Sequence, residues 1–357
     1  MQRCRHSLVH AVLLFVTVFS GTAPAQESRF FRIGTAATGG SFFEIGGIVA
    51  GAISSPIEGP TCERGGSCGV PGLVAVAIAT PGSLENLRQV AAGQIDSGFA
   101  QADLAGWAYN GTKVFAEGGP LRRLRAIASL FPEAAHLVVR ADSPIKSIAD
   151  LAGKNVSLGE LGSGSTVGAQ ILLSAAGFKE TDIGRKYLRP GRAGEELKAG
   201  TIDAFFLIGG YPVPAIRDLA ATIPLRLVPI EGPIVDALKH DFKFYGQTTI
   251  PGGIYPGIDG DTPSLGFSAL WVVNADINDD LVYAITQSLW RPATARLLAG
   301  LDPIGKRIRI ERALDGISVP LHPGAARFYR EAGMSTEGAP EASVEPDKSK
   351  QPIASQP

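Results

Sequence analysis

The strongest constraint on the fold is a pattern that repeats along the chain: a short apolar run, a turn rich in glycine or serine, and an amphipathic stretch with helical period. Such an alternation is typical of strands and helices that form mostly parallel sheets. The expected strands span residues 30–34, 73–79, 97–100, 124–130, 136–140, 155–158, 204–208 and 225–229. The expected helices span residues 42–53, 83–92, 102–111, 166–176, 191–199, 211–221 and 279–290. The sequence therefore predicts an α/β protein with helices flanking its sheets.

The first 25 residues have the composition of a secretory signal peptide. Arg3 and Arg5 form a basic start, residues 8–19 are apolar, and Ala23-Pro24-Ala25 provides small residues for cleavage. A membrane anchor is the alternative, but no cysteine follows the apolar run to accept a lipid. No other stretch reaches the ~18 apolar residues that a transmembrane helix needs. We therefore expect a periplasmic protein that does not insert into the membrane.

The length that remains predicts two lobes, because roughly 330 residues exceed what one hydrophobic core usually serves. Segments 137–142 and 270–276 both look like a buried strand that runs into a polar turn, so the chain is expected to cross between the lobes there. Lobe 1 then contains residues 28–135 and 268–334, lobe 2 contains residues 136–267, and a ligand cleft lies between them. Residues 335–357 offer little to bury and are expected to be disordered.

Charge and cysteine content limit the partners. Loss of the leader changes the formal charge from −1 to −3, with the two signs mixed along the chain, so nucleic acid and anionic lipid are poor candidates. Cys62 and Cys68 remain after cleavage. In an oxidising compartment they are expected to close a small loop as a disulfide, since a metal site would need more ligands nearby.

Two loops that join a strand to a helix are candidate anion sites. The first, at residues 35–41, contains Thr38 and Ser41 and leads to Phe42; the second, at residues 159–165, contains Ser163 and Ser165 and leads to Thr166. The unpaired amides of a helix start favour a bound anion. Simple helix capping is the alternative for Thr38 and Ser41. The glycine spacing of the second loop, G-x-G-x-x-x-G, is a poor match to the dinucleotide-binding fingerprint, so no cofactor is expected.

Three further side chains follow strand ends, where ligands of open α/β sheets bind. Ser83 and Asn86 lie after the strand at 73–79, and Gln101 ends the strand at 97–100. The amide of Gln101 can both donate and accept hydrogen bonds to orient a ligand. A solvated turn is the alternative for Gln101.

Catalytic patterns are weak. Gly65-Gly66-Ser67-Cys68-Gly69 matches the nucleophile pattern G-x-S-x-G, but no strand leads into it. His136, His240 and His322 are too far apart for a metal-binding motif. We therefore predict neither enzymatic activity nor a metal site.

Several motifs together resemble the TAXI-type solute receptors of TRAP transporters over nearly the whole chain after the leader: Gly34-Thr35, Gly39-Gly40, residues 80–86, Gln101-Ala102-Asp103, residues 109–112, residues 162–165 and residues 320–325. The resemblance implies a type II periplasmic binding fold, no enzymatic activity, a sodium-coupled membrane permease as partner, and a small organic acid or glutamate-like amino acid as solute. Members usually have tyrosine at Phe42 and proline at Glu44, so a phenolic contact to the ligand is lost here.

The predicted function is thus capture of a small anionic solute and its delivery to a TRAP-type transporter. A binding protein of an ATP-driven importer or a sensor is the first alternative, and a secreted hydrolase is the second. An arginine clamp from Arg189 or Arg192 is the alternative to binding by neutral donors. The predicted ligand-binding residues are Thr38, Ser41, Phe42, Ser83, Asn86, Gln101, Ser163, Ser165, Thr166 and Gly210.

Overall fold

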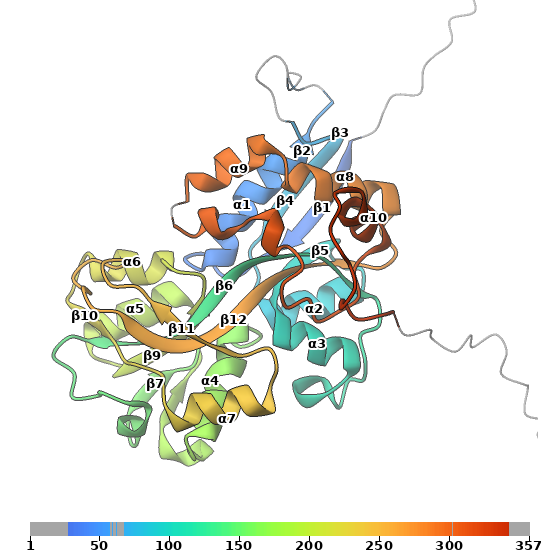
Figure 1. The fold of residues 1–357 in the computed structure, drawn as a ribbon. Helices are drawn as coiled ribbons and strands as arrows, with labels where there is room; N and C mark the ends of the chain where they lie inside the picture. Colours follow the sequence, from blue (N-terminus) through green and yellow to red (C-terminus); the bar gives the residue numbers. More distant parts are fainter. Residues whose placement is uncertain (1–27, 58, 60–61, 63–67, 302, 343–357) are drawn as a thin grey trace, which may run out of the picture.

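The computed structural model describes residues 28–57, 59, 62, 68–301 and 303–342, and it confirms the α/β class (Figure 1). The strands are β1 (Arg29–Gly34), β2 (Ser54–Ser55), β3 (Val70–Pro71), β4 (Leu73–Ile78), β5 (Ser97–Gln101), β6 (Leu124–Arg140), β7 (Asn155–Ser157), β8 (Gly184–Lys186), β9 (Ala204–Gly209), β10 (Leu225–Leu227), β11 (Gly246–Ile250) and β12 (Thr262–Asn274). The helices are α1 (Ser41–Ile53), α2 (Ser83–Ala91), α3 (Ala102–Asn110), α4 (Gly164–Ala175), α5 (Pro190–Ala199), α6 (Pro214–Ala220), α7 (Pro233–Asp241), α8 (Asp279–Leu289), α9 (Pro292–Ala299) and α10 (Pro323–Glu331).

One sheet runs through both lobes in the order β4-β1-β5-β12-β6-β9-β7-β8. Its two ends are parallel: β1 pairs with β4 and β5, and β7 pairs with β8 and β9. Between them β6 and β12 form an antiparallel pair that passes from one lobe to the other (Figure 1). The division at residues 136 and 267 stays a prediction.

Strand β6 corrects one expectation. The segments at 124–130 and 136–140 are one strand of 17 residues, in which Pro132 lies opposite Ser268. Proline breaks most central strands because it has no N–H to donate. Here the register shifts between Ala269 and Leu270, which leaves Leu130 without a partner on β12, and the strand continues through Pro132. The crossing is therefore continuous extended backbone.

Helices cover both faces of the sheet. On one face of lobe 1, α1, α8 and α10 bury a core that includes Phe31, Trp271 and Tyr329. In lobe 2, α5 and α6 pack against β9 around Phe205. On the opposite face, an apolar core continues from α2 and α3 to α4 and α7. Strand ends held between such layers are a firm base for a binding site.

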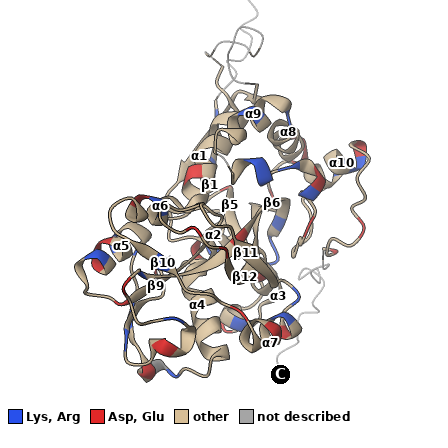
Figure 2. Cartoon of the chain, turned by 60° about the vertical axis from the view of Figure 1, so that its left-hand side comes forward, with Lys and Arg blue, Asp and Glu red and all other residues tan. Residues whose placement is uncertain are grey.

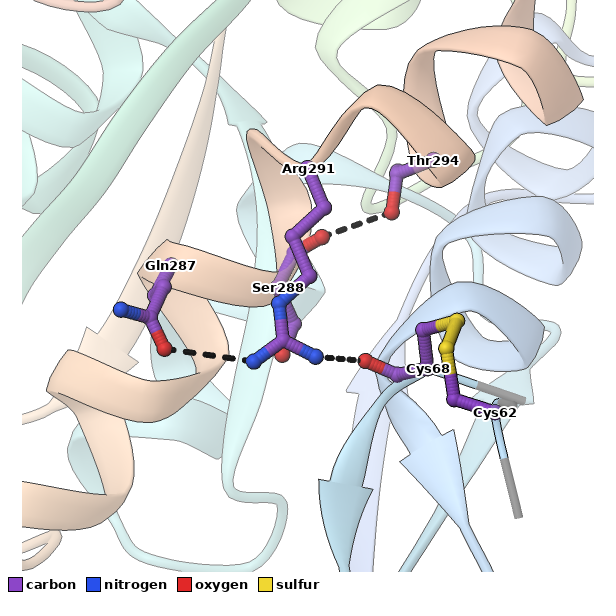
Figure 3. Close-up of a disulfide and its surroundings, with 6 residues drawn as sticks. All are labelled: Cys62, Cys68, Gln287, Ser288, Arg291 and Thr294. Atoms are coloured by element: carbon purple, nitrogen blue, oxygen red, sulfur yellow. Dashed lines mark hydrogen bonds between the residues drawn. A yellow bond between two sulfur atoms is a disulfide. The ribbon is translucent and has the colours of Figure 1, made fainter.

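The predicted disulfide between Cys62 and Cys68 is present, and Cys68 lies beside Arg291 of lobe 1 (Figure 3). Arg291, between α8 and α9, donates to the carbonyl of Cys68 and to Oε1 of Gln287, the latter at 3.3 Å (Figure 3). This arginine ties Cys68 to the body of lobe 1. Ser67 lies outside the described residues.

The surface mixes acidic and basic residues over both lobes (Figure 2). Within the described ranges, no helix is both long and apolar enough to cross a bilayer. The predicted signal peptide, at residues 1–25, lies outside the described residues. Of the predicted tail, residues 335–342 are described and Ala339 packs against the core, while residues 343–357 lie outside.

Candidate functional site: a cavity between the lobes

A cavity of about 50 Å³ lies where the carboxyl ends of strands from the two lobes face each other. The loops after β1 and β4 and the end of β5 line it from lobe 1. The loop after β7 and the residues of β9 line it from lobe 2. This is the position at which open α/β sheets bind ligands.

Two helices begin at the cavity without a side-chain cap. The N-cap of α1 is Gly40 and that of α2 is Gly82, and neither end has a side-chain cap hydrogen bond. Capping by Thr38 or Ser41, the alternative considered for this loop, is therefore wrong, because Ser41 Oγ instead accepts a hydrogen bond from the amide of Gly210 at 3.1 Å. The first amides of the two helices favour an acidic group in the cavity.

Six predicted ligand-binding residues line the cavity: Ser41, Phe42, Ser83, Gln101, Ser163 and Ser165. Gln101 is 2% exposed, and its Nε2 has no partner among the described residues. Ser83 Oγ accepts a hydrogen bond from the backbone amide of Gln101 at 3.2 Å. An unpaired buried donor that borders a cavity is ready for a ligand acceptor. Contact of these six with a ligand stays a prediction.

The other four predicted residues do not line the cavity. Thr38 is exposed, and the amide of Gly210 is bonded to Ser41. Thr166 donates from Oγ1 to the carbonyl of Glu160 at 2.7 Å, and its amide donates to Ser163 Oγ at 3.1 Å, so it shapes the start of α4.

Asn86 lies in the core of lobe 1 with no exposed surface. Its Nδ2 donates to the carbonyls of Thr35 and Phe99 at 2.7 and 2.8 Å, and its Oδ1 accepts from Thr80 Oγ1 at 2.7 Å. This amide links three segments of lobe 1 and faces no ligand space. The geometry gives Asn86 a structural role in place of the predicted ligand contact.

Glu133, Glu160 and the side of β9 were not predicted to belong to the site. Glu133, on β6, is 2% exposed, and its Oε2 has no partner in the described part of the chain. Burial, and then the negative charge of Asp103, raises the pKa of Glu133 to about 8. In the sequence, the sign of a special role for Glu133 was that it is a single acid within a long apolar run. The periodicity of neighbouring residues does not show whether such an acid belongs to a site.

The structure shows the lobes in contact around the cavity. The carbonyl of Gly39 accepts from the amide of Ala215 at 3.0 Å, and the carbonyl of Gly162 accepts from the amide of Glu85 at 3.2 Å. With the bond between Ser41 and Gly210, these bonds join residues assigned to different lobes. The two lobes are therefore in direct contact on more than one side of the cavity.

The proposed arginine clamp is not formed in this geometry. Arg189 pairs with Glu160 at 2.8 Å and has a side chain that is 73% exposed, and Arg192 pairs with Glu195 and Glu196 along α5. Neither arginine lines the cavity.

The histidines do not gather into a site. His136 is fully buried, with Nε2 at 2.9 Å from the hydroxyl of Tyr255, and burial lowers its pKa to about 4. His322 caps α10, and His240 is exposed beside Asp241. No group of three or more metal-ligating side chains occurs among the described residues.

The two lobes, the continuous crossing strands and a cavity at facing strand ends define the architecture of periplasmic solute-binding proteins. The chain belongs to the NMT1-like family, whose model matches residues 33–333. The TAXI subgroup stays a prediction from the motifs.

Several solved structures are similar to this chain. The alkanesulfonate-binding protein SsuA from Xanthomonas axonopodis pv. citri bound to MOPS has 16% identity and a TM-score of 0.46, with 87% of this chain and 82% of that chain covered. The aliphatic sulphonate binding protein SsuA from Escherichia coli has 18% identity and a TM-score of 0.40, with 84% and 82% covered. The substrate binding protein of an amino acid ABC transporter has 14% identity and a TM-score of 0.40, with 78% and 96% covered.

Proposed function

We propose that this protein is an extracytoplasmic receptor that captures a small acidic solute between its lobes and delivers it to a membrane importer. The observation that carries the proposal is the cavity itself, which both lobes line and which contains a buried unpaired donor, Gln101 Nε2, beside two uncapped helix starts. These groups suit the acid end of a solute.

Capture proceeds by closure. In the open form both lobes are hydrated, and a solute that contacts both shifts the population toward the closed form by its differential affinity. The three backbone and side-chain bonds that join the lobes contribute about 0.5–1.5 kcal/mol each to closure. Solute contacts of about 1.5–3 kcal/mol each, made to an ionised group, decide the equilibrium.

Two kinds of membrane importer are candidates for the partner. The motifs resemble receptors of TRAP transporters, whereas one of the similar structures is named for an ABC transporter. We take an ATP-driven importer as the first partner to test and a TRAP-type permease as the second. Neither assignment changes what the cavity binds.

A thermal-shift screen of organic acids, sulfonates and amino acids tests the receptor function. A solute at 100 times its Kd adds about 2.7 kcal/mol to the free energy of unfolding. We expect at least one member of the panel to raise the melting temperature by several degrees, and calorimetric titration to give one site per chain. A panel in which no compound stabilises the protein contradicts the proposal.

A further inference from the structure

Glu133 is a buried acid with an unpaired carboxyl oxygen among the described residues. It lies on β6 opposite Phe267, at the crossing between the lobes, and it borders the cavity. Its Oε2 is buried and makes no hydrogen bond with any described residue. Burial of an unpaired carboxyl group is unfavourable, and such a group in a native protein calls for an explanation.

The groups around Glu133 do not neutralise it. Asp103 on α3 adds a like charge, and the Tyr245 hydroxyl donates to Asp103 Oδ2 at 2.8 Å, so that hydroxyl is already engaged. Lys243 borders a second cavity, of about 310 Å³, that also includes Glu133, but it does not line the ligand cavity. Among the described residues that line the ligand cavity, none is a lysine or an arginine.

Glu160, the other acid at the ligand cavity, differs in this respect. Its Oε2 is likewise buried without a partner among the described residues, but its Oε1 is paired with Arg189 Nε at 2.8 Å, so its charge is compensated at the rim. Glu133 is therefore the acidic side chain of the cavity whose charge remains open to a cationic partner.

The cavity thus has two poles of opposite preference. The uncapped starts of α1 and α2 and the Nε2 group of Gln101 are donors that suit an acid group. Glu133 is an acceptor that suits an ammonium group. We infer that the solute is a small zwitterion, with its acid group at the helix starts and its ammonium group paired with Glu133. The inference rests on the proposed receptor function and adds the class of solute.

Proton release follows from this pairing. Because burial and Asp103 raise the pKa of Glu133 to about 8, the group is mostly protonated at pH 7 in the empty closed protein. A bound ammonium group stabilises the ionised form and lowers that pKa. Binding of a zwitterion at pH 7 should therefore release up to one proton, whereas binding of a simple acid would not.

Matched probes test the inference by calorimetric titration of the purified protein. The pairs are L-alanine with L-lactate, L-glutamate with glutarate, and taurine with isethionate, so that each pair differs in the amino group and the third tests a sulfonate. We expect the amino compound of the binding pair to bind at least tenfold more tightly. Its binding heat should also vary with the ionisation enthalpy of the buffer, as proton release requires.

Glu133→Gln keeps the shape and removes the charge, and Glu44→Gln removes a charge from the first turn of α1, where the side chain does not line the cavity. We expect Glu133→Gln to abolish the preference for the amino compound and the proton release, with an unchanged or higher melting temperature. Glu44→Gln should retain both.

Two outcomes overturn the inference. If the compounds without an amino group bind as tightly as their partners, or if Glu160→Gln rather than Glu133→Gln removes the preference, the assignment of Glu133 fails while the receptor function stands. If no compound of either kind binds, the receptor function fails and the inference falls with it.

Discussion

Gly164, the first residue of α4, lies against Gln101 and Ser83 of the opposite lobe. A Cβ at this position would overlap with Oε1 of Gln101 and would lie 2.9 Å from Ser83 Oγ, both in the opposite lobe. The backbone of Gly164 is helical, so alanine fits the open form without strain. Gly164→Ala therefore acts on closure and leaves the folding of each lobe intact.

The expected loss of solute affinity in Gly164→Ala follows from the cost of overpacking, about 1–3 kcal/mol. If the lobes stay apart, contacts with one lobe are lost; if Gln101 turns aside instead, its amide leaves the cavity. By either route the Kd of the best solute from the thermal-shift panel should rise about 5- to 150-fold, at about 1.4 kcal/mol per tenfold. The melting temperature without solute should stay within a degree or two of the original.

Calorimetric titration gives the Kd, and small-angle scattering with and without solute reports closure. Gly191→Ala is the matched control, since a Cβ on this residue near the start of α5 meets no atom within 4 Å. The reasoning is refuted if Gly164→Ala binds the solute as tightly as the original protein and compacts to the same extent.

Gln101→Ala should weaken solute binding by about 1–3 kcal/mol with little change in melting temperature, because its Nε2 has no protein partner to lose; unchanged affinity would move the acid pole elsewhere. Arg189→Ala should weaken binding by less than about 1 kcal/mol, because its pair with Glu160 is an exposed one at the rim; a larger loss in the same titration would support the arginine clamp. Replacement of both Cys62 and Cys68 by serine should lower the free energy of unfolding by about 2 kcal/mol in urea denaturation. That double variant should bind solute normally, because neither cysteine lines the cavity.

The sequence predicted those elements whose periodicity is strong. β1, α1 and α8 bury regular apolar positions, so their bounds agree with expectation to within one or two residues. β11 was missed because Gly246–Ile250 is mostly polar and forms a strand only by pairing with β12. The sequence did not predict β6 as one strand because Pro132 locally indicates a break, whereas in the structure Pro132 lies opposite Ser268 of β12 within one continuous strand.

The sequence predicted site residues that lie where a strand end leads to a helix start. It did not predict residues whose role depends on a partner far away in the sequence. Ser83 and Gln101 line the cavity because their place after a strand fixes them there. Asn86 has the same local context, but its amide is used by Thr35 and Phe99, which no local pattern reveals. Glu133 enters the site because β6 crosses between the lobes, which is a property of the sheet.

A crystal structure with the solute that stabilises the protein most tests the central claim directly. The account predicts closed lobes and density for one solute in the cavity, with its acid group at the starts of α1 and α2 and within hydrogen-bond reach of Gln101 Nε2. Density for the solute outside this cavity, or an empty cavity at saturating solute, would contradict it.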